Sequence, residues 1–263
     1  MKDKTPMKTV TERDIFEGLR GLDVAPGDKI VVHSSLSSMG RVDGGAETVV
    51  NAFLASVAPG GTVLVPVMTF GVPFDPRTTE SKCGAITEAF RRRPEALRSL
   101  SPTHSIAGIG PDAERLLDGH ERALPFGPNG PDSPLGKLAD EGGKIVLLGV
   151  THVSNTIVHI VLYRAELPAL EEWRGVDVTD SGGGQRIVNV QHPGCSLGFD
   201  ALEPYLMEKN AQKIAKIGNA DVRCMKASDV IEIGLAAVKE HPALLLCDRP
   251  DCRFCSYTRG KVT

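Results

Sequence analysis

Two short apolar strands joined by one amphipathic helix are the feature that most constrains the fold of this chain. Lys29 to His33 and Thr62 to Val67 are β-branched runs bounded by Pro and Gly, and Ala46 to Val57 between them has apolar residues at helical spacing. A strand, a helix and a second strand in this order form a right-handed crossover between parallel strands. The pattern therefore predicts an α/β fold whose mostly parallel sheet carries helices on both faces.

The rest of the chain continues this alternation. A helix begins after the N-cap Thr11, has Glu12 and Asp14 in its first turn, and extends through Leu19 or Leu22. Further helices are expected at 86–97, 112–117, 156–166, 199–209 and 228–240. Strands are expected at 105–109, 144–149 and, in an antiparallel hairpin, at 187–190, with long loops at 69–82 and 125–134.

The composition limits the kinds of partner. With 41% hydrophobic and 24% charged residues, the 263-residue chain can bury one continuous core, so residues 1–263 are expected to form a single domain. The net charge is -3 and no block of Lys and Arg is present, so nucleic acid is not an expected partner. No apolar run approaches the ~20 residues that cross a bilayer, and the polar N-terminal segment is unlike a signal peptide. We expect a cytoplasmic protein with no membrane partner.

Two polar segments have the chemistry to bind phosphate. The segment from Ser34 to Ser38 follows a strand directly, where backbone N–H groups are free to meet an anion, although serines there are more often turn and capping residues. Arg98 offers a planar fork of donors that fits phosphate, although a surface ion pair is the commoner role for such an arginine. Neither segment identifies a ligand alone.

Four motifs taken in order point to a family. They are His33-Ser-Ser-Leu36, Arg98-Ser-x-x-Pro-Thr-His-Ser105, the loop from Pro125-Phe-Gly to Ser133-Pro134, and Asn155-Thr-x-x-His159. Together they make the chain resemble the aminoglycoside 3-N-acetyltransferase family over nearly its whole length, from about residue 11 to residue 255.

The resemblance implies a three-layer α/β/α sandwich around a mixed, mostly parallel sheet. It also implies direct transfer of an acetyl group from acetyl-coenzyme A to an amino group of an aminoglycoside or a similar small amine, by a protein that forms a homodimer. The residues that it implies for the coenzyme site are Ser34, Ser35, Leu36, Ser37, Arg98, Ser99, Ser105, Phe126 and Gly127.

His159 falls on the catalytic histidine of the family. A primary amine is protonated near neutral pH and becomes a nucleophile only when a base takes its proton, for which imidazole has a suitable pKa. Family members usually carry a carboxylate three residues later to orient this ring, and here Leu162 stands at that position. Asn155, Tyr163 and Glu166 are the residues near enough on a helix to replace it.

Cysteines are grouped near the C-terminus. Cys247, Cys252 and Cys255, with Cys195 as a fourth ligand, could form a tetrahedral structural zinc site, and free thiols are the alternative. Cys83 and Cys224 have no partner by spacing and are expected to be buried packing residues.

Two other functions stay open. The chain could be a housekeeping or biosynthetic acyltransferase that uses another amine or another acyl group, or a non-catalytic coenzyme A-binding scaffold that lost its orienting carboxylate. An acidic cleft would suit a polycationic aminoglycoside, and Glu171, Glu172, Asp177 and Asp180 permit one.

Overall fold

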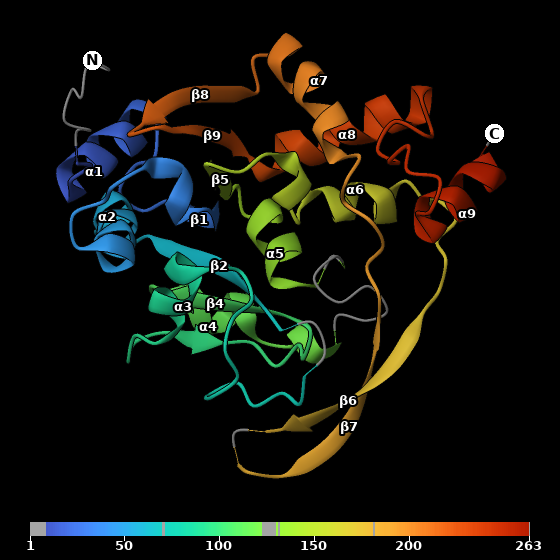
Figure 1. Ribbon diagram of the computed structural model, residues 1–263, viewed down its shortest axis with the longest axis horizontal. Coiled ribbons are helices and arrows are strands. Elements are labelled where there is room, and N and C mark those ends of the chain that lie inside the picture. Colours follow the sequence, from blue (N-terminus) through green and yellow to red (C-terminus); the bar gives the residue numbers. More distant parts are fainter. Residues whose placement is uncertain (1–8, 70–71, 123–129, 131, 181, 263) are drawn as a thin grey trace, which may run out of the picture.

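The computed structural model describes residues 9–69, 72–122, 130, 132–180 and 182–262. Within them, one seven-stranded sheet has the order β3-β4-β2-β1-β5-β9-β8, and a separate pair of strands forms the hairpin β6–β7 (Figure 1). The strands are β1 (Lys29–Ser34), β2 (Thr62–Met68), β3 (Leu97–Arg98), β4 (His104–Ile109), β5 (Lys144–Leu148), β6 (Trp173–Thr179), β7 (Gln185–Gln191), β8 (Gln212–Ile217) and β9 (Ala220–Lys226).

The sheet is mixed, as expected, but only its two central pairings are parallel and its other four are antiparallel, so it is less parallel than the pattern predicted. Its centre is parallel, because β1 pairs in parallel with both β2 and β5. Each outer strand pairs antiparallel with its neighbour, so β4 and β9 run against the other strands and β3 and β8 return to the direction of β1. The β-α-β prediction is thereby confirmed, since α2 (Gly45–Val57) connects β1 to the parallel strand β2.

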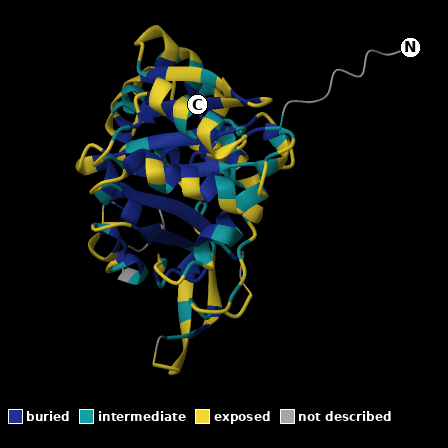
Figure 2. Ribbon diagram, turned by 90° about the vertical axis from the view of Figure 1, so that its left-hand side faces the viewer, coloured by how far each residue is buried: buried dark blue, intermediate teal, exposed yellow. Residues whose placement is uncertain are grey.

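Helices cover both faces of the sheet. They are α1 (Glu12–Gly21), α2, α3 (Ala85–Arg91), α4 (Ala113–Leu117), α5 (Pro134–Asp140), α6 (Val158–Arg164), α7 (Glu203–Glu208) and α8 (Ala227–Glu240). The last helix, α9 (Arg253–Val262), packs outside the main core, in a small cluster with Leu246 and Cys247. Alternate side chains of β1 face opposite layers: Ile30 and Val32 pack with α1, α2 and α3, whereas Val31 packs with α4 to α8. This gives the expected three-layer sandwich, whose buried strands lie in the interior of Figure 2.

Local signals fixed several boundaries. The Thr11 hydroxyl accepts from the backbone N–H of Asp14, and the Asp14 carboxylate accepts from the backbone N–H of Thr11, which is a complete capping box. The helix expected at 86–97 ends instead at Arg91, so this prediction was wrong in its second half. Pro94 cannot continue a helix, and Leu97–Arg98 pair with β4 as an edge strand.

The hairpin β6–β7 projects from the body of the protein and is largely exposed (Figures 1 and 2). Phe74, from the long loop after β2, attaches it to the body: its backbone N–H donates to Asp177 O at 2.7 Å, and its ring packs with Val176, Val178 and Val190. Among the described residues, no helix is long and apolar enough to cross a membrane.

Candidate active site

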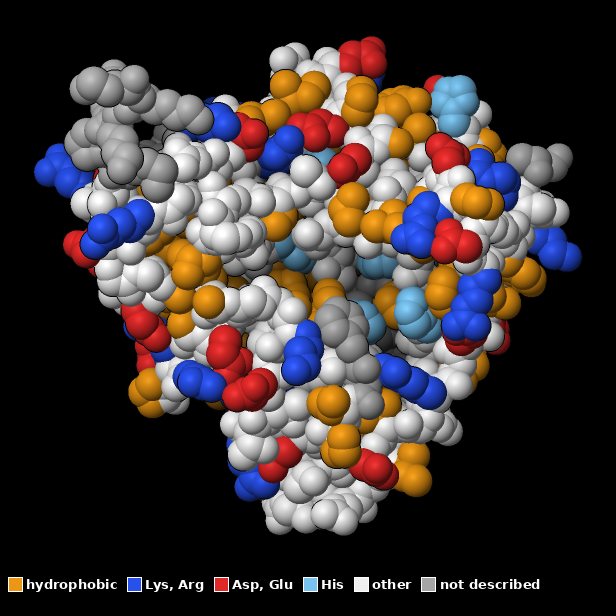
Figure 3. Space-filling model, viewed as in Figure 1, with side chains coloured by type: hydrophobic (Ala, Val, Ile, Leu, Met, Phe, Trp, Pro, Cys, Tyr) orange, Lys and Arg blue, Asp and Glu red, His pale blue; other side chains and the backbone are white. Residues whose placement is uncertain are grey.

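A cavity of about 640 Å³ lies where β1, β2 and β5 end. Its floor includes His33 and Ser34 of β1, Met68 of β2 and Val150 just after β5. The carboxyl ends of parallel strands meet at one edge of a sheet, which is where α/β folds bind ligands. Figure 3 shows a hollow near the centre of this face, with histidine side chains gathered in it.

His159 lies in the first turn of α6 and lines this cavity. Only 9% of the residue is exposed, its ring contacts the Phe199 ring edge-on at 4.8 Å, and its Nδ1 has no hydrogen-bond partner among the described residues. Burial, with smaller contributions from His104 and His192, lowers the pKa of His159 to about 3. The imidazole is therefore neutral at physiological pH, with a lone pair available.

Besides His159 and His33, two more histidines line the cavity, and neither was predicted as a site residue from the sequence. His104, at the start of β4, has its pKa lowered to about 4 by burial and by the neighbouring His192 and Arg174. His192 follows β7, and its Nδ1 accepts from the backbone N–H of Gly194 at 3.0 Å. His104 stands inside the Pro-Thr-His-Ser motif, so that motif already contained the signal for it.

No described carboxylate takes the place of the missing acid. Leu162 packs into the core and lines a smaller, apolar cavity of about 280 Å³ beside the first. Asn155 is directed elsewhere, because its Nδ2 donates to His152 Nδ1 at 3.2 Å and its Oδ1 accepts from the backbone N–H of Ile157. Tyr163 and Glu166 line the smaller cavity with Leu162. The unpartnered Nδ1 of His159 is the atom that an orienting acid would hold.

Asn155 instead belongs to a buried chain of polar groups. His152 Nε2 donates to Gln212 Oε1 at 2.7 Å, and Gln212 Nε2 donates to Glu203 Oε1 at 3.1 Å. Arg223 Nε donates to the same Glu203 oxygen at 2.9 Å. These hydrogen bonds connect α7, β8 and β9 to the loop that precedes α6. They therefore hold in place the loop that leads into the helix of His159.

The residues expected at the coenzyme site are only partly brought together. Ser34 lines the cavity, and Ser35, Leu36 and Ser37 follow it at the start of a 3-10 helix, η1 (Leu36–Met39). Ser35 Oγ and Ser37 Oγ lie 3.2 Å apart. The loop from Ser34 to Ser37 therefore begins at the edge of the cavity, where a segment that binds a ligand is expected.

Arg98, Ser99 and Ser105 are not among the described residues that line the cavity. Arg98 Nε donates to Ser105 Oγ at 2.9 Å, and Ser99 Oγ lies 2.7 Å from His120 Nδ1. Ser99 and Ser105 are buried. Phe126 and Gly127 lie outside the described residues.

Charged side chains from the hairpin region and from α9 also line the cavity. Glu172 is the only carboxylate among the described residues of the cavity lining, and it pairs with Arg253 at 2.7 Å between its Oε2 and Nη2. Arg174 lies beside it on β6. Asp177 and Asp180 lie further along the hairpin and do not line the cavity. The described lining is thus not acidic.

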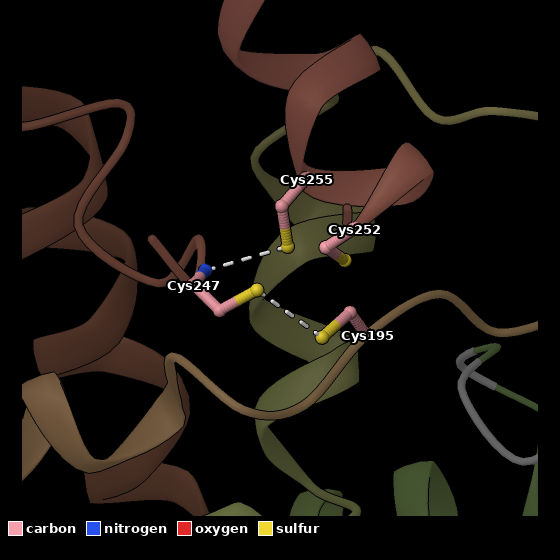
Figure 4. A group of neighbouring side chains, drawn as sticks. All are labelled: Cys195, Cys247, Cys252 and Cys255. Atoms are coloured by element: carbon pink, nitrogen blue, oxygen red, sulfur yellow. Dashed lines mark hydrogen bonds between the residues drawn. The ribbon is translucent and has the colours of Figure 1, made fainter. Parts of the chain in front are cut away.

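The four C-terminal cysteines do come together. The Sγ atoms of Cys195, Cys247, Cys252 and Cys255 all lie within 4.8 Å of one another (Figure 4). Cys195 Sγ is 3.7 Å from Cys247 Sγ, close to the ~3.8 Å between thiolates on a tetrahedral zinc with Zn–S bonds of ~2.3 Å. Backbone N–H groups of Leu197 and Cys247 donate to the sulfurs of Cys195 and Cys255 at 3.4 and 3.3 Å.

The two remaining cysteines lie apart from this cluster. Cys224 is buried in the sheet core, as expected. Cys83 is half-buried, lines the cavity, and accepts from the backbone N–H of Met68 at 3.4 Å.

The chain is similar to known proteins over most of its length. The family model described as aminoglycoside 3-N-acetyltransferase matches residues 31–239. Aminoglycoside N(3)-acetyltransferase IV from Salmonella is 30% identical over 238 residues, which cover 89% of each chain.

Solved structures match as well. The apoenzyme of aminoglycoside acetyltransferase AAC(3)-IVa is 28% identical, with a TM-score of 0.86 over 98% of this chain and 100% of its own. A histidine-to-alanine mutant of that enzyme, in complex with a gentamicin, is 27% identical over the same shares, with a TM-score of 0.85. AAC-IIIb in a binary complex with coenzyme A is 25% identical, with a TM-score of 0.80 over 89% of this chain and 97% of its own.

Proposed function

Because this chain belongs to the aminoglycoside 3-N-acetyltransferase family, we propose that it transfers an acetyl group from acetyl-coenzyme A to an amino group of an aminoglycoside or similar small amine. Its relatives are named as acetyltransferases, so the chain is an enzyme of the acyltransferase class. The observation that carries the proposal is His159, a neutral and buried imidazole in a cavity large enough for a small ligand.

His159 acts as the general base in this proposal. The amine nitrogen attacks the thioester carbonyl carbon, a C–N bond forms, and the C–S bond breaks to release the coenzyme A thiolate. The attacking amine becomes strongly acidic as it bonds to carbon, so it can lose its proton to a base of low pKa. His159 Nε2 accepts that proton, and the ring returns it to the departing thiolate.

The depressed pKa of His159 has two opposite effects. It keeps the ring unprotonated across the physiological range, but it also weakens the ring as a base. A carboxylate near Nδ1 would raise that pKa, and the described part of the cavity offers none. The acceptor amine enters the same poorly solvated cavity, which favours its neutral form and lowers the demand on the base.

The coenzyme is proposed to lie along the strand-exit loop. Ser34 opens onto the cavity, and Ser35 to Ser37 follow with small side chains that let a ligand approach the backbone. Coenzyme A is the ligand in the solved complex of AAC-IIIb.

A structural zinc ion is proposed at the cysteine cluster. The donor set fits, because four sulfurs converge, three of the cysteines come from the C-terminal segment and one from the segment after β7, and two sulfurs accept backbone N–H bonds that stabilise thiolates. Zinc in such a site adds folding stability by joining the two segments. Elemental analysis of the purified protein should find about one zinc per chain, and none after Cys247→Ser and Cys255→Ser are combined.

The activity is tested by thiol release from acetyl-coenzyme A, with a panel of aminoglycosides and simple amines as acceptors. Turnover of an amine that falls by at least about 100-fold in His159→Ala supports the mechanism. His241→Ala is the matched control, because His241 is exposed at the end of α8. Full turnover by His159→Ala would refute the assignment of the base.

A less cationic amine is the second candidate acceptor. The single carboxylate of the described lining, Glu172, is already neutralised by Arg253, and Arg174 stands beside it. A polycationic drug gains little from such a wall. Higher kcat/KM for simple amines than for every aminoglycoside in the panel would favour this acceptor.

A further inference from the structure

The cysteine cluster and the cavity share the same two segments. Cys195 lies three residues after His192, which lines the cavity, and Arg253 and Phe254 lie between Cys252 and Cys255. Residues that line the cavity and cysteines of the cluster therefore alternate along these two segments. A displacement of the cysteines therefore has to move the cavity-lining residues next to them in each of the two segments.

The segment that contains His192 and the segment that contains Phe254 are joined by a direct ring contact and by a bridge through Glu172. The rings of His192 and Phe254 stack with their centroids 4.4 Å apart and their planes 15° from parallel. Arg253 Nη2 pairs with Glu172 Oε2 at 2.7 Å, and the backbone N–H of His192 donates to Glu172 O at 2.8 Å. The position of His192 is thus fixed from the side of α9.

The cluster is packed closely enough to transmit a displacement. A Cβ built on Gly198 would lie 2.5 Å from Leu245 O and 2.8 Å from Cys247 N, so the chain after Cys195 passes directly against the chain before Cys247. Cys247 and Cys255 are buried. Without a link between the sulfurs, α9 would be held in place mainly by weaker contacts, such as the bond from Thr258 Oγ1 to Pro168 O at 2.7 Å.

We propose that the cysteine cluster, closed by zinc, positions one wall of the active site through Phe254, so that the stack on His192 sets the affinity for the acceptor amine. This rests on the proposed function and on the proposed zinc site. Phe254 is a positioning residue that acts through His192. The strand-exit loop at Ser34, where the coenzyme is proposed to bind, belongs to β1 and η1 and shares no residue with the two segments that carry the cluster.

The first test does not depend on activity. Trp173 is the only tryptophan of the chain, lies next to Glu172 and lines the same wall, so its fluorescence reports the state of that wall. Removal of zinc by a chelator, followed by elemental analysis, is expected to shift Trp173 emission to longer wavelength, and added zinc is expected to reverse the shift. Unchanged emission after complete removal, or a purified protein that takes up no zinc, would overturn the proposal.

The second test separates positioning from folding. Phe254→Leu keeps an apolar side chain and all four cysteines but removes the ring stack on His192, so the variant is expected to retain zinc. The KM for the acceptor amine is expected to rise about tenfold, which is ~1.4 kcal/mol. The KM for acetyl-coenzyme A is expected to stay within twofold. Phe254→Tyr should restore the acceptor KM. Tyr257→Leu is the control, because Tyr257 is an exposed aromatic on the same helix.

These two tests separate failure of the zinc-to-wall link from failure of the proposed acetyltransferase function. If no amine is acetylated, the proposed function fails, while the zinc-dependent response of Trp173 in the wild type and its loss in Phe254→Leu still test the link. An equal rise of both KM values in Phe254→Leu, or no rise in either, would show that Phe254 does not position the acceptor wall.

Discussion

Replacement of Arg98 is expected to destabilise the protein, because its guanidinium is held by several hydrogen bonds. Its guanidinium donates to Ser105 Oγ at 2.9 Å and to the carbonyl of Thr79, with longer bonds of 3.3 and 3.4 Å to the carbonyls of Val67 and Pro76. These bonds join the long loop after β2 to the sheet. The geometry therefore assigns Arg98 to the support of that loop, whereas the sequence motif assigns it to a coenzyme phosphate.

The magnitude follows from the two short bonds. A hydrogen bond to a charged donor contributes about 1.5–3 kcal/mol, so Arg98→Met is expected to lower the free energy of unfolding by about 3 kcal/mol. Methionine keeps most of the packing of the alkyl chain, but it loses the cation–π contact with Phe74, whose ring centroid is 4.9 Å from the guanidinium carbon. For a domain of this size the corresponding fall in Tm is about 6–12 °C.

Thermal and urea unfolding measure the loss of stability in Arg98→Met. The alternative, a role in binding the coenzyme phosphate, is measured by the KM for acetyl-coenzyme A. Arg249→Met is the control, because Arg249 forms an exposed pair with Asp251 and should cost less than about 0.5 kcal/mol. Unchanged stability of Arg98→Met with a tenfold or larger rise in the KM for acetyl-coenzyme A would refute the structural reasoning and support the phosphate role.

Three further predictions concern the strand ends and the histidines. Gly149→Ala should destabilise the protein by about 2 kcal/mol in urea unfolding, since Gly149 has φ +66° and an added Cβ would lie 1.7 Å from Ser38 Oγ; equal stability would contradict this. Burial, and then His152, lowers the pKa of His33 to about 3, so the native state takes up its proton far below the unfolded value of 6.5. Its contribution to stability is therefore lost as pH falls from about 6.5 toward 3, by up to about 1.4 kcal/mol per pH unit. His33→Asn should lessen the slope of stability against pH by this amount in unfolding measured from pH 6 to 4, while His104 and His159, whose pKa values are lowered to about 4 and 3, keep the rest of it; parallel curves for the two proteins would refute it. Leu162→Glu should raise the pKa of His159, measured by NMR titration, if the new carboxylate reaches Nδ1 as the family pattern implies; an unchanged or lower pKa would show that this position faces away from the ring.

Local patterns predicted the first half of the fold well. The crossover, the helix N-cap at Thr11 and the strand expected at 144–149, which the structure ends at Leu148, depend on short-range signals, such as apolar periodicity and turn residues, which the sequence carries directly. The sequence offered Cys195, Cys247, Cys252 and Cys255 as a possible zinc site, with free thiols as the alternative, and the four sulfurs do converge in the structure.

The second half was predicted less completely. The hairpin of β8 and β9 was not predicted, although the Gly218-Asn219 turn between two alternating runs is a hairpin signal. β8 lies at the sheet edge and is rich in Lys and polar residues, so its pattern differs from that of the central strands. Strand β6 and helix α9 were also missed. Their few buried apolar residues lie in two small clusters apart from the main core, one around Phe74 and one around the cysteines, so neither segment carries a strong apolar pattern.

The site itself required the tertiary structure. His159 was found from its motif, but His104 and His192 reach it from β4 and from the segment after β7, and no spacing relates the three positions. The sequence permitted an acidic cleft but left the charge of the cavity wall open. Glu172 looked available for a cationic substrate, and only the fold shows that Arg253, 81 residues away, neutralises it.

The central claim is that acetyl transfer takes place beside His159. A crystal structure of the chain with coenzyme A bound tests it most directly, by the distance between the thiol sulfur and His159 Nε2. Since an attacking amine must lie ~3 Å from both the thioester and the base, the sulfur is expected within about 6 Å of Nε2. A thiol that ends elsewhere, with His159 unreachable by any amine placed against the thioester, would contradict the account.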